Sequence, residues 1–224
     1  MDIHIRTKID TWWSYIETAV LRIGKDRFEV QGGDGLKYWF NDNPGRPNPS
    51  EKRALGRKMA GQYKIRFHQL NDRQHQFKVE LNNGDKVVFK TFKEFVRVNV
   101  ETKNAYSKDF ASSVGLMGTY PSGLHMSRDN STVVEDVNEF GNLWQVQPAK
   151  EGMLFHTVDG PQHPQHQCTM PTVTESSRKQ RRLGEALITQ EDAELACARV
   201  NPSDRDACVF DVLATNDKDM AGSY

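Results

Sequence analysis

The sequence predicts a mainly β protein, an antiparallel β-sandwich followed by a small C-terminal helical hairpin. Two observations predict the sandwich. Apolar and polar residues alternate along several short runs, which gives each strand one buried and one wet face. Turn residues separate these runs at short intervals, as in all-β domains. A change to helical periodicity near the C-terminus predicts the hairpin.

The alternating runs account for most of the first hundred residues, and they occupy residues 2–10, 14–23, 27–32, 63–67, 77–81, 85–92 and 96–100. Gly24-Lys25-Asp26 separates two of them. Asn83-Gly84 is the strongest hairpin signal, because a type I′ turn requires positive φ at both central residues. Residues 32–61 are rich in Gly, Pro and Asn, so we expect an irregular loop there, with a short helical turn near residues 51–59.

Three segments follow from these changes in composition. Residues 1–147 are expected to form the β domain, and residues 148–184, rich in Pro, Gln, His and Ser, a linker. Residues 185–224 are expected to form the helical hairpin. Thr189 and Asp192 resemble a capping box that begins a helix running to about Arg199. Asn201-Pro202 then begins a second helix, with proline at its first position.

Cysteine spacing predicts a disulfide within the hairpin. Cys197 lies four residues before Asn201 and Cys208 six after Pro202, so on antiparallel helices they sit roughly 6 and 9 Å from the turn. Their Cα atoms can then approach to the distance that a disulfide requires. A bridge would indicate an oxidising compartment. The alternative is a pair of reduced core cysteines. Cys168 makes the number of cysteines odd. It is either a free thiol or a cysteine whose disulfide partner lies elsewhere.

Composition restricts the classes of function. The 224 residues carry 30 basic and 30 acidic side chains, with a sequence pI of about 7.1, which argues against a nucleic-acid partner. No apolar run is long enough for a membrane span. The sequence contains no G-x-S-x-G, P-loop or H-E-x-x-H motif, so we predict that the protein is not an enzyme.

Two motifs carry a resemblance to a known family. The first is Gly115-Leu116-Met117-Gly118-Thr119-Tyr120, and the second contains Asp136, Phe140-Gly141-Asn142 and Trp144. Together they resemble the end of a von Willebrand factor type D domain, which pairs a G-L-C-G-N-[FY] segment with a later D-x-x-x-[FY]-G-N-x-W strand. The tail is similar to the cysteine-containing helical segment that follows such domains, through Cys208, Phe210, Asp211 and Val212.

The resemblance implies a protein that works outside the cell. It suggests a non-enzymatic module for adhesion, or for matrix or cell-wall assembly, that binds an extracellular protein or matrix or associates with itself. The family's opening strand has no counterpart here, so the chain would belong to a longer or truncated precursor, and Cys168 would have lost its partner or would pair between molecules. The family's loop cysteine is Met117 in this chain, where packing is expected to replace the cross-link.

The family's loop often binds calcium through Asn and Asp side chains, and hard cations take oxygen ligands. The resemblance therefore implies a calcium site here, for which Asp129, Asn130 and Asp136 are the nearest candidates. Asn130-Ser131-Thr132 is also an N-glycosylation sequon, usable in a secreted protein.

A second function class uses the His-rich segment 156–168. His156, His163, His166 and Cys168 offer zinc ligands, which would make the protein a secreted metal-binding protein or enzyme. The prolines in this segment favour an extended, solvated linker instead. Metal analysis separates the two functions, because stoichiometric zinc is expected only for the second.

Overall fold

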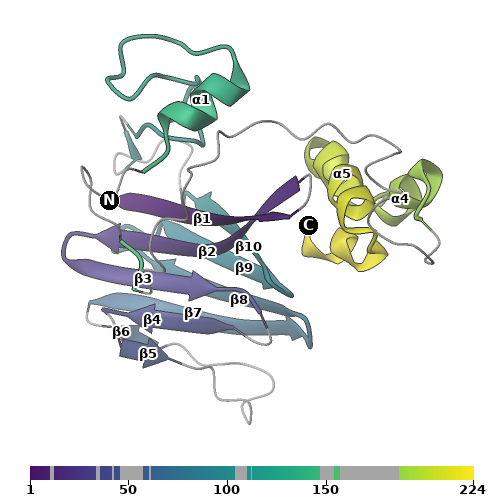
Figure 1. Cartoon of the computed structure of the whole chain (residues 1–224). Coiled ribbons are helices and arrows are strands. Elements are labelled where there is room, and N and C mark those ends of the chain that lie inside the picture. The colour runs from purple at the N-terminus through teal and green to yellow at the C-terminus, as the bar shows by residue number, and fades with distance from the viewer. Residues whose placement is uncertain are drawn as a thin grey trace.

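The computed structural model describes residues 1–10, 13–33, 36–41, 43–45, 58–60, 62–103, 110–111, 113–146, 154–156 and 187–224. Within these ranges the chain forms two five-stranded antiparallel sheets followed by short helices (Figure 1). The first sheet contains β1 (Asp2–Asp10), β2 (Trp13–Ile23), β3 (Asp26–Gln31), β4 (Lys37–Phe40) and β5 (Asn43–Gly45). The second contains β6 (Lys58–Ala60), β7 (Tyr63–Asn71), β8 (Gln74–Glu80), β9 (Lys86–Phe92) and β10 (Phe95–Glu101).

Both sheets are simple meanders, because every strand pairs with its neighbours in sequence. Short turns make this topology favourable, since antiparallel neighbours can be joined by only a few residues. One such turn, at Gly24, connects β2 to β3 and gives the pairing Ile23 with Asp26. The prediction of a mainly β chain with antiparallel sheets is therefore confirmed.

The inward faces of the two sheets form the main core. Phe28, Phe77 and Phe89 are fully buried there. Rings from opposite sheets meet directly: the centroids of Phe28 and Tyr63 lie 5.3 Å apart, and those of Tyr38 and Phe67 lie 4.7 Å apart. Each fully buried phenylalanine stabilises the fold by about 1.5–3 kcal/mol. The sheets therefore pack face to face as a sandwich.

Backbone from the two sheets comes into close contact at Gly32, just after β3. Its amide donates to the Glu17 carbonyl at 3.1 Å, and the next amide, of Gly33, donates to the Lys93 carbonyl at 2.8 Å. A Cβ on Gly32 would lie 2.2 Å from the carbonyl oxygen of Glu94. Glycine is required here because backbone from the β9–β10 turn occupies the space of a side chain.

The C-terminal residues 187–224, called the helical module below, contain α4 (Gln190–Ala196), the 3₁₀ helix η2 (Pro202–Asp204), α5 (Arg205–Thr215) and the 3₁₀ helix η3 (Lys218–Ser223). Thr189 is the N-cap of α4, and its hydroxyl accepts from the Asp192 amide at 3.2 Å. The predicted caps are therefore correct. The predicted end of the first helix was wrong, because α4 stops at Ala196 and the next residues form turns.

The structure corrects three further local predictions. Residues 32–61 are not only loop, since they contain β4, β5 and β6. The hairpin at Asn83-Gly84 exists, but only Gly84 has positive φ, at 92°. The Gly84 amide donates to the Leu81 carbonyl and the Leu81 amide to the Asp85 carbonyl. This pattern indicates a three-residue loop with a glycine bulge and not a type I′ turn.

The third correction concerns the second family motif, which we expected to be a strand. Residues Val137–Leu143 form helix α1 instead. Asp136 is its N-cap, with Oδ1 accepting from the Asn138 and Glu139 amides at 2.8 Å each. A carboxylate that accepts two amide hydrogen bonds at this point favours a helix over a strand. None of the described helices is long and apolar enough to cross a membrane.

Candidate functional site

The helical module is cross-linked by the predicted disulfide. Cys197 and Cys208 are bonded, with their Cα atoms 6.0 Å apart, and both are fully buried. They lie in a second core with Val212, Met220 and Phe92. Because Phe92 belongs to β9, the bridge stabilises a module that is packed on the second sheet, and the hairpin does not stand alone.

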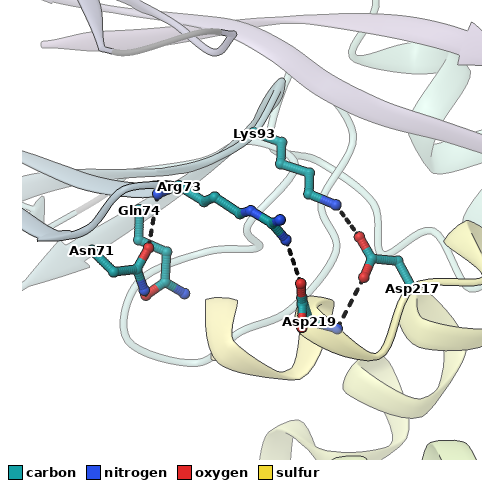
Figure 2. A network of polar contacts seen from close by, with 6 residues as sticks. All are labelled: Asn71, Arg73, Gln74, Lys93, Asp217 and Asp219. Carbon is teal, nitrogen blue, oxygen red and sulfur yellow. Dashed lines mark hydrogen bonds and ion pairs between the residues drawn. The ribbon is translucent and has the colours of Figure 1, made fainter.

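Ion pairs fasten the module to the ends of the strands (Figure 2). Lys93, in the β9–β10 turn, pairs with Asp217, and Arg73, in the β7–β8 turn, pairs with Asp219. The Asp219 amide donates to Asp217 Oδ1 at 3.0 Å, which links the two acids. Gln74 donates to the Gly222 carbonyl. These contacts set how the module lies against the sheet.

A cavity of about 430 Å³ lies between β10 and the module. Asp211 of α5 and Tyr224 face each other there, and the tyrosine hydroxyl donates to Asp211 Oδ2 at 2.5 Å. Burial raises the pKa of Asp211, and burial together with this hydrogen bond raises the pKa of Tyr224. The Arg97 guanidinium lies 4.5 Å from the Tyr224 ring centroid. These polar groups contact each other, so they hold the module in place.

Residues 113–146, called the loop segment below, extend from one end of the sandwich (Figure 1). They contain a small cluster of their own: His125 stacks on the buried Phe140 at 4.4 Å, and the Trp144 indole donates to the Met126 carbonyl at 3.1 Å. Phe140 and Trp144 are the aromatic residues of the second family motif. Their role in this chain is therefore to fix the shape of the loop segment.

The expectation that packing of Met117 replaces a cross-link was wrong. Met117 is 64% exposed and Leu116 is 46% exposed. Backbone hydrogen bonds hold this part of the loop, among them Tyr120 N–H to Ser113 O at 3.1 Å and Thr119 N–H to Leu124 O at 2.9 Å. Because the backbone determines the loop conformation, the methionine side chain is left in solvent.

The predicted calcium ligands lie in the loop segment, but the structure gives them local roles. Asp129 Oδ1 accepts from the hydroxyls of Ser127 at 2.5 Å and Ser131 at 2.7 Å, and these hydrogen bonds lower its pKa. Asp136 caps α1. Among the described residues no group of three His, Cys, Asp or Glu side chains gathers to hold a metal. Calcium binding stays a prediction.

The sequon lies in an accessible turn. Asn130 is exposed, with a φ of 57°, and its amide N–H donates to the Ser127 carbonyl at 2.8 Å. Ser131 and Thr132 are exposed as well. An exposed turn is the kind of site that a glycosylating enzyme can reach, so the geometry is compatible with modification of Asn130.

The described part of the His-rich segment lies on the outer face of the first sheet. The His156 amide donates to Glu29 Oε2 at 2.5 Å, and its ring lies 5.9 Å from that of Trp39. Glu29 is 3% exposed, and its other carboxyl oxygen has no hydrogen-bond partner among the described residues. Burial raises the pKa of Glu29. His163, His166 and Cys168 lie outside the described residues.

Several residues that matter in the structure gave no signal in the sequence. In the sequence, Glu29 stands in an alternating run and Asp211 in an amphipathic one, where carboxylates are usually exposed. Glu29 is covered by His156, more than a hundred residues away, and Asp211 is covered by Tyr224, the last residue described.

Comparisons of the chain with protein-family models, with curated proteins and with solved structures gave no match.

Proposed function

We propose that this chain is a non-enzymatic binding module of an extracellular protein, similar to a von Willebrand factor type D domain, and that it presents the loop segment to a protein or matrix partner. The sandwich and the disulfide-linked module form a rigid support. Loops on such a support commonly carry binding residues. Structural disulfides are typical of proteins in oxidising compartments.

One observation carries this proposal. The loop segment exposes six large apolar side chains, those of Leu116, Met117, Leu124, Val133, Val137 and Leu143, with exposed fractions between 39% and 64%. Elsewhere in the described residues only Met1, Leu70, Leu187 and Leu195 are comparable. Exposed apolar side chains concentrated in one segment offer surface that a partner can cover. A partner that covers it would gain the free energy of apolar burial.

Binding to decellularised extracellular matrix tests this proposal. We expect the double variant Leu116→Ser, Met117→Ser to bind at least about tenfold more weakly than wild type, because the two lost burials together remove more than about 1.4 kcal/mol. Leu195→Ser is the matched control, since Leu195 is 76% exposed but lies on α4. Equal loss in both variants, or no binding by wild type, would contradict the proposal.

The same variants distinguish self-association from binding to matrix. Sedimentation analysis of wild type across a range of concentrations measures the oligomeric state directly. If the loop double variant alone abolishes a dimer, the partner is a second copy of the chain. If all proteins sediment as monomers and only matrix binding changes, the partner is a matrix component.

The extracellular setting has its own test. In secretory cells we expect a glycan at Asn130, detected as a mass loss after enzymatic removal. Asn130→Gln and Thr132→Ala should both abolish this shift, whereas Ser131→Ala should retain it, since the middle residue of the sequon is free to vary. Secreted protein without a glycan would count against Asn130 as a modified site.

A thermal melt with millimolar Ca²⁺ tests the calcium prediction. An unchanged Tm would contradict the prediction that the loop segment binds calcium.

A further inference from the structure

The outward face of the second sheet carries an ordered set of cations. Phe77, Val79, Val87 and Phe89 point into the core, so alternate residues of the same strands point outward. Cross-strand register then sorts the outward residues into rows. The two middle rows are Arg66–Lys78–Val88–Asn99 and His68–Gln76–Lys90–Arg97.

Each of the four long strands contributes one cation to a stripe that steps from one row to the next between β8 and β9: Arg66 from β7, Lys78 from β8, Lys90 from β9 and Arg97 from β10. We call these four residues the basic stripe. Neighbouring strands lie about 4.8 Å apart, so the stripe crosses about 14 Å of the sheet. It is bounded on one side by Phe92 and Phe95, which pack against the helical module.

The bounding row on the other side has a different charge pattern. It reads Lys64–Glu80–Lys86–Glu101, with opposite charges facing each other across every strand pair. Within the stripe, by contrast, Arg66 directly faces Lys78 and Lys90 directly faces Arg97. Like charges directly opposite destabilise a sheet. The stripe therefore opposes folding, and a ligand of opposite charge would relieve the repulsion.

Much of the stripe's charge remains available to a ligand. Arg66 pairs with Glu80 at 3.2 Å and Arg97 with Asp204 at 3.8 Å, yet their side chains stay 43% and 36% exposed. Lys78 and Lys90 form no ion pair with any described residue. The pKa of His68 is lowered, first by burial and then by Lys78 and Arg66.

This face already binds an acidic surface within the chain. The whole sequence is neutral, but residues 187–224 carry eight acidic and three basic side chains, namely Glu191, Asp192, Glu194, Asp204, Asp206, Asp211, Asp217 and Asp219 against Arg199, Arg205 and Lys218. That acidic module packs against one end of the basic sheet, with Asp204 facing Arg97. Charge complementarity therefore selects an acidic partner for the remainder of the stripe.

We propose that the basic stripe binds a linear sulfated polysaccharide laid across strands β7 to β10. Anionic groups repeated along one chain match cations repeated at the strand spacing. The choice of a glycan over a nucleic acid rests on the extracellular function proposed above. None of the four stripe residues belongs to the loop segment, so separate variants test the two interactions.

Heparin binding by the intact chain tests the proposal. We expect Lys78→Gln, Lys90→Gln to bind more weakly and to reduce the slope of log K against log salt concentration by about 2, because each lost contact releases about one counterion fewer. The matched control Lys64→Gln, Lys86→Gln removes two cations from the same face. It should change binding much less, because its row alternates in charge.

Three outcomes would overturn the proposal: no heparin binding by wild type, equal weakening in both double variants, or tighter binding of single-stranded DNA of similar length than of heparin. The last outcome would assign the stripe to a nucleic acid. Unfolding does not confound the result, because removing like-charge repulsion should leave the Tm of the stripe variant at or above that of wild type. The loop double variant should keep heparin binding, so failure of either proposal is seen independently.

Discussion

Single buried polar residues connect parts of this chain that are distant in sequence. Glu29 is the clearest example, because its carboxylate lies on the outer face of β3 and accepts a hydrogen bond from the backbone amide of His156. Arg27, on the same strand, donates to the Leu154 carbonyl at 3.1 Å. Residues 154–156 are therefore fastened to the first sheet by polar side chains, as Asp217 and Asp219 fasten the helical module to the second.

The buried carboxylate of Glu29 makes stability depend on pH. Burial raises its folded-state pKa, although the His156 amide, Arg6 and Arg27 oppose the shift. Because the folded state favours the protonated carboxyl, the contribution of Glu29 to the free energy of unfolding is fully present below the ordinary Glu pKa of about 4.3. This contribution is lost as pH rises through the folded-state pKa. Glu29→Gln keeps an acceptor for the amide and removes the charge.

We therefore expect Glu29→Gln to unfold at higher denaturant concentration than wild type at pH 7, and this advantage should vanish below about pH 4. Urea titrations at several pH values measure it. Glu135→Gln is the control, because Glu135 is an exposed residue of the loop segment and its substitution should show no such trend. A Glu29→Gln variant that is equally or less stable at pH 7 would show that the ionised carboxylate is well accommodated.

The helical module shows how short elements become stable. α4 has only seven residues, and isolated helices of this length are marginal in water. Three features compensate: the Thr189 cap, the disulfide to α5 and the packing of Val212 and Met220 on Phe92. The cap alone contributes only about 1 kcal/mol.

Removal of the disulfide should destabilise this module. For a sequence separation of 11, closing the loop contributes about 3 kcal/mol. We expect Cys197→Ala, Cys208→Ala to lose about this amount, measured by denaturant unfolding, with faster amide exchange in α4 and α5. Cys168→Ala serves as the control for losing a cysteine elsewhere. If α4 and α5 exchange as in wild type, packing alone holds the hairpin.

The described residues form two main cores that meet at the second sheet. The larger lies between the sheets, and the smaller lies between β9, β10 and the helical module. Phe77 and Phe89 fill the first, whereas Phe92 and Phe95 point outward into the second. Because the second sheet supplies both cores, it is the element on which the rest of the described chain is organised.

This arrangement predicts two levels of unfolding. Phe77→Ala should reduce global stability by about 3–5 kcal/mol and speed amide exchange in both sheets. Met220→Ala, at a side chain 4% exposed, should cost about 2–5 kcal/mol but act mainly on the module, whose opening leaves the sandwich intact. Hydrogen exchange resolves the two. Equal acceleration across all described elements in both variants would instead indicate one cooperative unit.

Local pattern accounts for what could be predicted. Features that depend only on neighbouring residues were predicted correctly. They are the alternation at β1, β7 and β10, the turn at Gly24, and the caps at Thr189 and Asn201. The Cys197–Cys208 bridge was also accessible, because both cysteines lie within one turn-connected pair of helices.

The errors had two sources: a strand that is defined by its pairing partner, and local hydrogen bonds that the family resemblance did not include. Residues Lys37–Phe40 are too few for their alternation to predict a strand, and they form β4 because they pair with β3. Residues 137–143 read as a strand by family resemblance but form a helix through the Asp136 cap. The resemblance predicts a packed Met117, but backbone hydrogen bonds hold the surrounding loop and the side chain lies in solvent.

The sequence by itself determined the class of fold and the disulfide, because alternation, turns and spacing act within a few residues. Only the tertiary structure decided which polar groups are buried, such as Glu29 and Asp211, and which cations face one another across the second sheet. Those properties depend on register and on contacts between segments far apart in the chain, and a one-residue change of register would reverse every outward side chain.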